Sequence, residues 1–201
     1  MSTAETEMRS KLRDDARIRS LFLTAESRHL TAEEFNQYSM LAPQFKSREV
    51  AAREIMDVQL AVVSKTVKQI FSMYPYPKHH ENALEKALRD IGYVSVYATH
   101  SMLQDDPDWF RDKLLIWLKT ILQSFSYPAR EETDPTTAAA RQPLPHPEIT
   151  EHADTIPPKG RRSIYETYSR LIVNYQEVLS PQTFNMIRPH LQLAVDILSS
   201  D

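Results

Sequence analysis

The 201-residue sequence predicts an all-α fold, and three features support that class. Apolar residues recur at steps of three and four along several segments, as they do on one face of an α-helix. No segment of useful length alternates apolar and polar residues, as a half-buried strand would. Gly92 and Gly160 are the only glycines, which disfavours glycine-turned β-sandwiches, phosphate loops and dinucleotide-binding folds. We expect about six to eight helices.

Capping residues and prolines predict where the first helices begin and end. Residues 1–30 are charged and weakly amphipathic, and we expect a helical extension there. Thr31 and Glu34 have the spacing of a capping box and predict a short helix that Pro43 ends. The longest uninterrupted helical pattern covers residues 47–73.

A second group of helices follows an interruption by prolines at 75 and 77. Residues 79–103 resume the helical period. Asp106 is suited to cap the next helix and Pro107 to occupy its first position. That helix has a broad apolar face and should continue to the aromatic-proline pair that ends at Pro128.

The stretch 128–160 differs from the rest because it holds seven of the thirteen prolines and few large apolar residues. It is typical of an extended or disordered insertion, and it acts either as a passive loop or as a docking segment. Helical patterns return near Ile164 and again after Ser180, where Pro189 should kink or split the last helix. Residues 1–201 are therefore expected to form a single domain.

Composition excludes several classes of function. The formal net charge of −3 gives no reason to expect nucleic acid as a partner. Cysteine is absent, so the chain has no disulfide, thiolate zinc ligand, cysteine nucleophile or thioether-linked cofactor. The sequence begins without an apolar signal segment and has no run long enough to span a membrane. We expect a soluble, cytoplasmic protein.

The segment Lys86-Ala87-Leu88-Arg89-Asp90-Ile91-Gly92-Tyr93 resembles the chromophore helix of phycobilisome proteins. The usual sequence there is a cysteine, one residue and then Arg-Asp-Ile/Leu-x-Tyr, and residues 89–93 match the phycocyanin α-type version. The resemblance covers roughly residues 30–128, and residues 161–201 only by helix pattern. It implies a globin-like, phycobiliprotein-type fold for this chain.

The resemblance also implies a site. In the family the cysteine fixes a bilin by a thioether, the aspartate accepts hydrogen bonds from pyrrole nitrogens, and the arginine pairs with a propionate. Ala87 stands at the cysteine position, so no bilin attaches covalently there. Asp90 shares a helix face with position 87, and Arg89 is offset by about 100°. Arg89, Asp90 and Tyr93 are therefore candidates for a noncovalent bilin pocket.

Two other interpretations of these residues remain open. In the first, the residues are retained for structure. Asp90 then pairs with a basic neighbour, Arg89 bridges helices and Gly92 allows close helix approach. Alternatively, Arg89 and Asp90 are solvated residues of an exposed face, which is the usual state of charged side chains.

No residue pattern predicts a metal site or a catalytic site. His79, His80 and His100 invite a metal or haem interpretation, but adjacent histidines on a helix point about 100° apart. No third ligand is placed by the sequence. The carboxylates and hydroxyls show no nucleophile–base order either, so we expect that the protein is not an enzyme.

The N-terminal 30 residues predict an interaction surface. In the resembled family the N-terminal helices pair subunits, and five apolar residues here suit such a strip: Leu12, Ile18, Leu21, Phe22 and Leu23. An apolar strip without a partner would be an exposed liability. The strip would contact other phycobilisome or photosynthetic proteins, or a second copy in a homo-oligomer. The alternative is a frayed tail.

The leading functional hypothesis follows from the matched motif without its cysteine. It is a non-chromophorylated phycobilisome-like protein that acts by protein–protein contacts in cyanobacterial light harvesting, in an assembly, accessory or regulatory role. Such a protein would be cytoplasmic and peripheral to the thylakoid. The alternatives are a noncovalent bilin or tetrapyrrole carrier or sensor, and a cofactor-free globin-type stress-signalling module.

Overall fold

A computed structural model describes residues 15–74, 82–124 and 162–200, and its regular elements in these ranges are all helical. They are α2 (Ala16–Ala25), α3 (Ala32–Leu41), a 3-10 turn (Pro43–Phe45), α4 (Lys46–Met73), α5 (Ala83–Gln104), α6 (Pro107–Phe110), a π-helical turn (Arg111–Leu115), α7 (Ile116–Ser124), α9 (Arg162–Val178) and α10 (Pro181–Ser199). No strand occurs within the described ranges. The predicted all-α class is confirmed.

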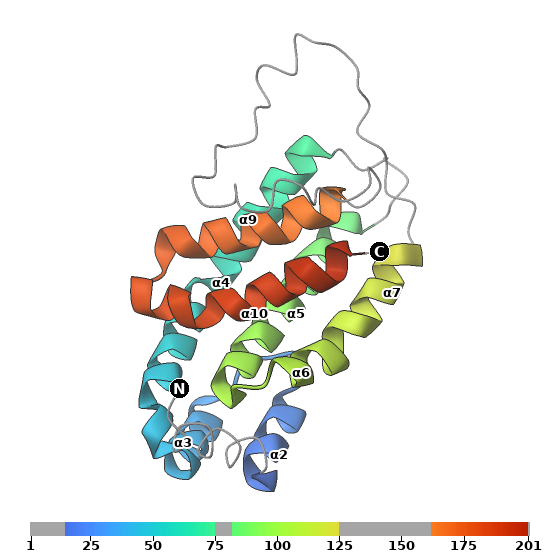
Figure 1. Cartoon of the computed structure of the whole chain (residues 1–201). Coiled ribbons are helices and arrows are strands. Elements are labelled where there is room, and N and C mark those ends of the chain that lie inside the picture. Colours follow the sequence, from blue (N-terminus) through green and yellow to red (C-terminus); the bar gives the residue numbers. More distant parts are fainter. Residues whose placement is uncertain (1–14, 75–81, 125–161, 201) are drawn as a thin grey trace, which may run out of the picture.

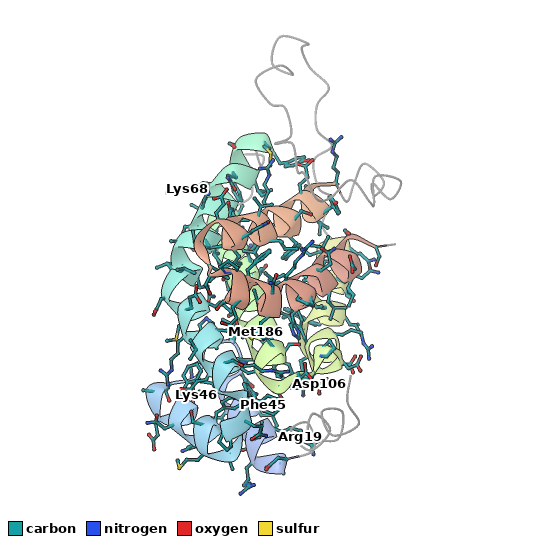
Figure 2. The ribbon with its side chains drawn as sticks, turned by 60° about the vertical axis from the view of Figure 1, so that its left-hand side comes forward. Arg19, Phe45, Lys46, Lys68, Asp106 and Met186 are labelled. Carbon is teal, nitrogen blue, oxygen red and sulfur yellow. The ribbon has the colours of Figure 1, made fainter. Side chains whose placement is uncertain are left out.

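The two long central helices, α4 and α5, pack against each other and against the pair formed by α9 and α10 (Figure 1). α6 follows α5 and packs against it, and the π-helical turn and α7 then lie against α10. α2 and α3 lie together at the end where α4 begins. In Figure 2 this end is marked by Arg19, Phe45 and Lys46, while Lys68 lies toward the other end of α4.

The core is one cluster of apolar side chains to which every long helix contributes. Its largest fully buried members are Tyr38, Tyr175, Phe22, Phe35, Phe110, Ile18, Ile55, Leu103, Leu115, Leu118, Leu171 and Ile187. Burying one such aliphatic or phenyl side chain contributes roughly 1.5–3 kcal/mol relative to its exposed state. The helices are therefore held by their shared apolar faces rather than by helix propensity alone.

The predicted caps are present at two helix starts. The backbone N–H of Glu34 donates to Thr31 Oγ1 at 3.3 Å, and Glu34 Oε2 accepts from the backbone N–H of Thr31 at 2.8 Å. The backbone N–H of Trp109 donates to Asp106 Oδ1 at 3.0 Å. Each cap satisfies amides that the first turn of a helix leaves unpaired.

The cap of α10 includes a residue from α4. Ser180 is the N-cap, and its hydroxyl donates to Glu54 Oε2 at 2.8 Å. The backbone N–H of Ser180 and the hydroxyl of Thr183 also donate to the Glu54 carboxylate. Burial alone would raise the pKa of Glu54, but these hydrogen bonds lower it below its ordinary value. The carboxylate thereby ties α4 to the beginning of α10.

Two helix predictions differ from the structure in detail. Pro189 was expected to kink or split the last helix, and it does not split it, because α10 continues through it to Ser199. Ile187, His190 and Leu191 around the proline are buried, so packing offsets the lost backbone hydrogen bond. The helix expected from Pro107 onward is also not one α-helix, since a π-helical turn at Arg111–Leu115 interrupts it.

The N-terminal apolar strip packs onto its own chain over the described residues, and this corrects the expectation of a free interface. Ile18, Leu21 and Phe22 are buried, and only Leu23, at 52% exposure, faces outward among the strip's described members. Leu12 lies outside the described residues, as do the insertion at 128–160 and the pair His79 and His80. No described helix has the length and hydropathy that a membrane crossing needs.

Candidate functional site

The motif residues occupy the first half of α5, where the helix emerges from the core. Ala87 and Tyr93 are half-buried and pack against the core cluster. Ala87, Asp90 and Tyr93 follow one another at steps of three, and Tyr97 comes one further turn along. Such steps place side chains in a row along one helix face. The face therefore joins the predicted residues Ala87, Asp90 and Tyr93 with Tyr97.

The two charged residues of the motif pair with each other. Arg89 Nε donates to Asp90 Oδ1 at 2.8 Å, and the side chains are 53% and 23% exposed. This hydrogen bond raises the pKa of Arg89. Asp90 thus has the basic neighbour that the structural interpretation expects, but both residues belong to α5, so this ion pair does not join two helices. Its exposure makes the pair a small contributor to stability.

Gly92 is not required for close helix approach. Its carbonyl accepts from Gln59 Nε2 of α4 at 3.2 Å. A β-carbon added at position 92 would meet the same Gln59 atom at 4.0 Å, which is ordinary van der Waals contact. Its φ is not positive either. The site therefore accepts a side chain the size of alanine.

Gly92→Ala is expected to raise the free energy of unfolding by about 0.5–1 kcal/mol, because alanine loses less backbone entropy than glycine in a helix interior. The Gln59 hydrogen bond to the backbone carbonyl should persist. Urea denaturation followed by circular dichroism measures the difference. A destabilised variant would show that the helices approach each other more closely at Gly92 than the structure indicates.

An aromatic stack extends the site beyond the predicted residues. Tyr97 stacks on Trp109 of α6 with ring centroids 5.3 Å apart and planes 21° from parallel. Both rings are half-buried. Tyr97 was not among the predicted site residues, although its position four residues after Tyr93 places it on the same face. The contact with Trp109 depends on how α6 folds back on α5 and had no signal in the sequence.

The end of α2 borders this stack. Burial raises the pKa of Tyr97 above its ordinary value, and the nearby Glu26 and Tyr93 raise it further. Glu26 is the C-cap residue of α2 and has a positive φ of 46°. The helix end therefore adds a second carboxylate beside the aromatic face, which carries Asp90 at its other end.

This arrangement suits a flat, conjugated ligand with polar edges. Tyr93, Tyr97 and Trp109 offer ring faces and edges, the Asp90 carboxylate can accept hydrogen bonds from ring N–H groups, and the exposed Arg89 guanidinium can pair with a carboxylate. With alanine at position 87 and no cysteine in the chain, the site has no means of forming a thioether.

The buried serine–histidine pair at the other end of α5 is not arranged as a nucleophile and its base. The Ser101 hydroxyl donates to the Asp106 carbonyl at 2.8 Å, and it lies 2.7 Å from His190 Nδ1. Because the Ser101 hydroxyl donates its proton to this carbonyl, its oxygen accepts a hydrogen bond from Nδ1–H of His190. The neutral His190 is therefore assigned the tautomer with the proton on Nδ1. To act as a general base, Nδ1 would have to be unprotonated and accept a hydrogen bond from the Ser101 hydroxyl.

The described histidines do not form a metal site of three or more ligands. Within residues 15–74, 82–124 and 162–200, no group of three or more histidine, aspartate or glutamate side chains is placed to hold a metal ion. His100, the candidate on α5, is fully buried among aromatic rings.

Comparison with known proteins identifies one family. A family model described as "Phycobilisome protein" matches residues 23–134, which is more than half of the chain and includes the whole α5 motif. The comparisons with curated proteins and with solved structures give no match.

Proposed function

Because the chain belongs to the phycobilisome protein family, we propose that it is a non-chromophorylated member that acts through protein–protein contacts in light harvesting. Its role would be assembly, accessory or regulatory, without catalysis. It would work in the cyanobacterial cytoplasm at the thylakoid surface, as a single domain over residues 1–201. The family has a globin-like all-α fold, assembles into a light-harvesting complex and normally binds bilins.

The observation that carries this proposal is the motif without its attachment residue. Arg89, Asp90 and Tyr93 are present, but position 87 is alanine and the chain has no cysteine. A member that cannot hold a covalent pigment contributes no covalently bound chromophore to energy transfer. Its contribution to the complex then comes from the surfaces it offers to other subunits.

Exposed apolar side chains support a role in contacts. Trp117 is 55% exposed on α7 and lies beside the exposed Ile116. Other large apolar residues at the surface are Leu23, Met40, Val50, Met56, Leu60, Leu84 and Val178. Tryptophan is enriched at interaction surfaces because it has a large apolar area and a polar N–H.

The proposal is tested by mixing the purified protein with isolated phycobilisomes and separating bound from free protein by density-gradient sedimentation. We expect co-sedimentation, with no pigment on the chain after denaturation. Trp117→Lys should weaken binding, and Thr120→Lys, also exposed on α7, is the control for added charge. A protein that neither self-associates nor binds any phycobilisome component would contradict the proposal. Binding to signalling proteins instead would favour the stress-signalling alternative.

A second candidate function, noncovalent bilin binding, is favoured by the aromatic face next to Asp90. The stack of Tyr97 on Trp109 continues the row formed by Asp90 and Tyr93, and a flat ligand would lie along this row. In this case the Arg89–Asp90 pair would separate, because each group would meet a polar edge of the bilin.

Visible spectra of the protein mixed with phycocyanobilin test this second candidate. We expect a shifted band that Asp90→Ala and Tyr97→Ala each abolish and that disappears on denaturation. Glu85→Ala is the matched control, since Glu85 is an exposed carboxylate on the same helix. An unshifted spectrum would rule out the bilin site, and an equal loss in the Glu85 variant would show that the effect is not specific.

A further inference from the structure

A buried imidazole lies where the N-terminal helices meet the body of the protein. His100 of α5 is 0% exposed. Its ring centroid lies 5.1 Å from that of Phe22, 6.1 Å from Trp109 and 6.3 Å from Tyr97. The ring of His29 lies 6.5 Å away at an angle of 84°. His100 is thus enclosed by three aromatic rings and a second imidazole.

Neither ring nitrogen of His100 makes a hydrogen bond. A buried polar group without a partner costs free energy, so it needs an explanation. His190, the other deeply buried histidine described, has the Ser101 hydroxyl as its partner. The two ring nitrogens of His100 are therefore buried without a hydrogen-bond partner that would offset their loss of contact with water.

Two of the four rings around His100 come from the N-terminal elements. Phe22 belongs to α2, and His29 lies in the connection between α2 and α3. His29 Nε2 is hydrogen-bonded to Gln59 Oε1, and Gln59 also donates to the Gly92 carbonyl. When α2 is in place, Phe22 and His29 cover His100 and separate it from water.

The charged groups around His100 do not favour a proton on it. They are His29 and Arg28 in the α2–α3 connection and Glu34 in α3. Glu34, the only acidic member, is held by Arg28 through contacts of 2.7 and 2.9 Å. Burial first, then His29 and Arg28, lower the pKa of His100 to about 3, despite opposing effects of Glu34 and the Arg28 backbone. Burial also lowers the pKa of His29, although its Gln59 hydrogen bond opposes this.

We propose that the contact of α2 with α5 is a pH-sensitive latch: α2 stays docked while the imidazoles of His29 and His100 are neutral, and it is released when the pair gains protons. Release exposes Ile18, Leu21 and Phe22, which are buried in the docked state. When the pH falls, the latch would thus expose an apolar strip next to Leu23. This inference goes beyond the proposed function, because it stands whether or not a partner uses that strip.

The direction of the effect follows from linkage. In the docked state His100 binds protons less readily than in the open state, where its pKa returns to the ordinary value of about 6.5. Lowering the pH below that value therefore favours the open state. Between pH 7.5 and 5.0, His100 alone should increase the opening equilibrium constant of α2 about 30-fold.

Amide hydrogen exchange of the whole chain measures this opening. After correction for the intrinsic exchange rates, the protection of amides in residues 20–25 should fall at least about 30-fold from pH 7.5 to 5.0, with His29 adding to the effect of His100. His100→Phe keeps a ring against Phe22 and Trp109 but has no titratable nitrogen, so the roughly 30-fold part of the fall that His100 causes should be lost and only the part due to His29 should remain. His190→Asn, the matched control, should leave the fall in α2 unchanged.

Two outcomes would overturn the latch. The first is protection of α2 that does not depend on pH. The second is protection of α2 that falls together with that of α10 and responds to His190→Asn, since it would mean that α2 opens only by global unfolding. If His100→Phe does not fold, NMR titration of the wild-type imidazoles decides the matter. His100 titrating near its ordinary pKa with α2 still docked would contradict the proposal.

Discussion

Phe22→Ala is expected to lower the free energy of unfolding by about 3–5 kcal/mol, because truncation of a buried phenylalanine loses its transfer free energy and leaves a cavity. Phe22 is 0% exposed and makes edge contacts with Tyr38 at 6.2 Å and Trp109 at 6.4 Å between ring centroids. Urea denaturation at pH 7.5, followed by the fluorescence of Trp109 in a Trp117→Phe background, reports directly on this region. These two residues are the only tryptophans in the chain.

Leu23→Ala is the matched control, since the neighbouring side chain is half-exposed and its loss should change stability by about 0.5 kcal/mol or less. The comparison shows whether the N-terminal strip belongs to the core or is an interface between copies. A strip that belongs to the core makes Phe22 far more sensitive than Leu23 in the monomer. If Phe22→Ala instead leaves stability unchanged and reduces self-association, the strip is an interface between copies and the docking of α2 described above is wrong.

Acidification from pH 7.5 to 5.0 is expected to remove about 2 kcal/mol of stability through His190 alone. Burial, with a smaller effect of Arg48, lowers the pKa of His190 to about 4, although Asp105 opposes the shift. Because the folded-state pKa lies below the ordinary value of about 6.5, the unfolded chain takes up the proton first as the pH falls. The contribution is complete above about pH 6.5 and is lost progressively toward pH 4.

His190→Asn tests this contribution, because the asparagine amide can donate to Ser101 in place of Nδ1–H but does not titrate. We expect the difference in unfolding free energy between wild type and variant to change by about 2 kcal/mol between the two pH values. Urea denaturation followed by circular dichroism measures it. A difference that is equal at pH 7.5 and 5.0 would show that His190 is protonated to the same extent in the folded and unfolded states.

Much of the fold was predictable because its signals are local. The capping box at Thr31 and the cap at Asp106 depend on residues within three positions, as does the local contact of the Thr183 amide with Ser180, and all three helix starts were predicted correctly. The long helical pattern of residues 47–73 corresponds to α4 within one residue. The family was recognised from a contiguous motif within α5, and the family match confirms it.

What the sequence could not provide are contacts between distant residues. The stack of Tyr97 on Trp109 depends on the turn between α5 and α6. The pairing of His29 with His100 depends on how the α2–α3 connection folds over α5. That Pro189 does not split α10 could not be read from the sequence either, since burial on both sides of a proline has no local signal.

The sequence by itself determined that this protein is a helical phycobilisome family member without a thioether-linked pigment, because side-chain chemistry and helix periodicity are properties of neighbouring residues. Only the tertiary structure decided which apolar residues are available for contact. Phe22 and Leu23 are adjacent and both apolar, but they point to different sides of α2, and only the packing of that helix against residues of α3, α5 and α6 buries one and leaves the other exposed.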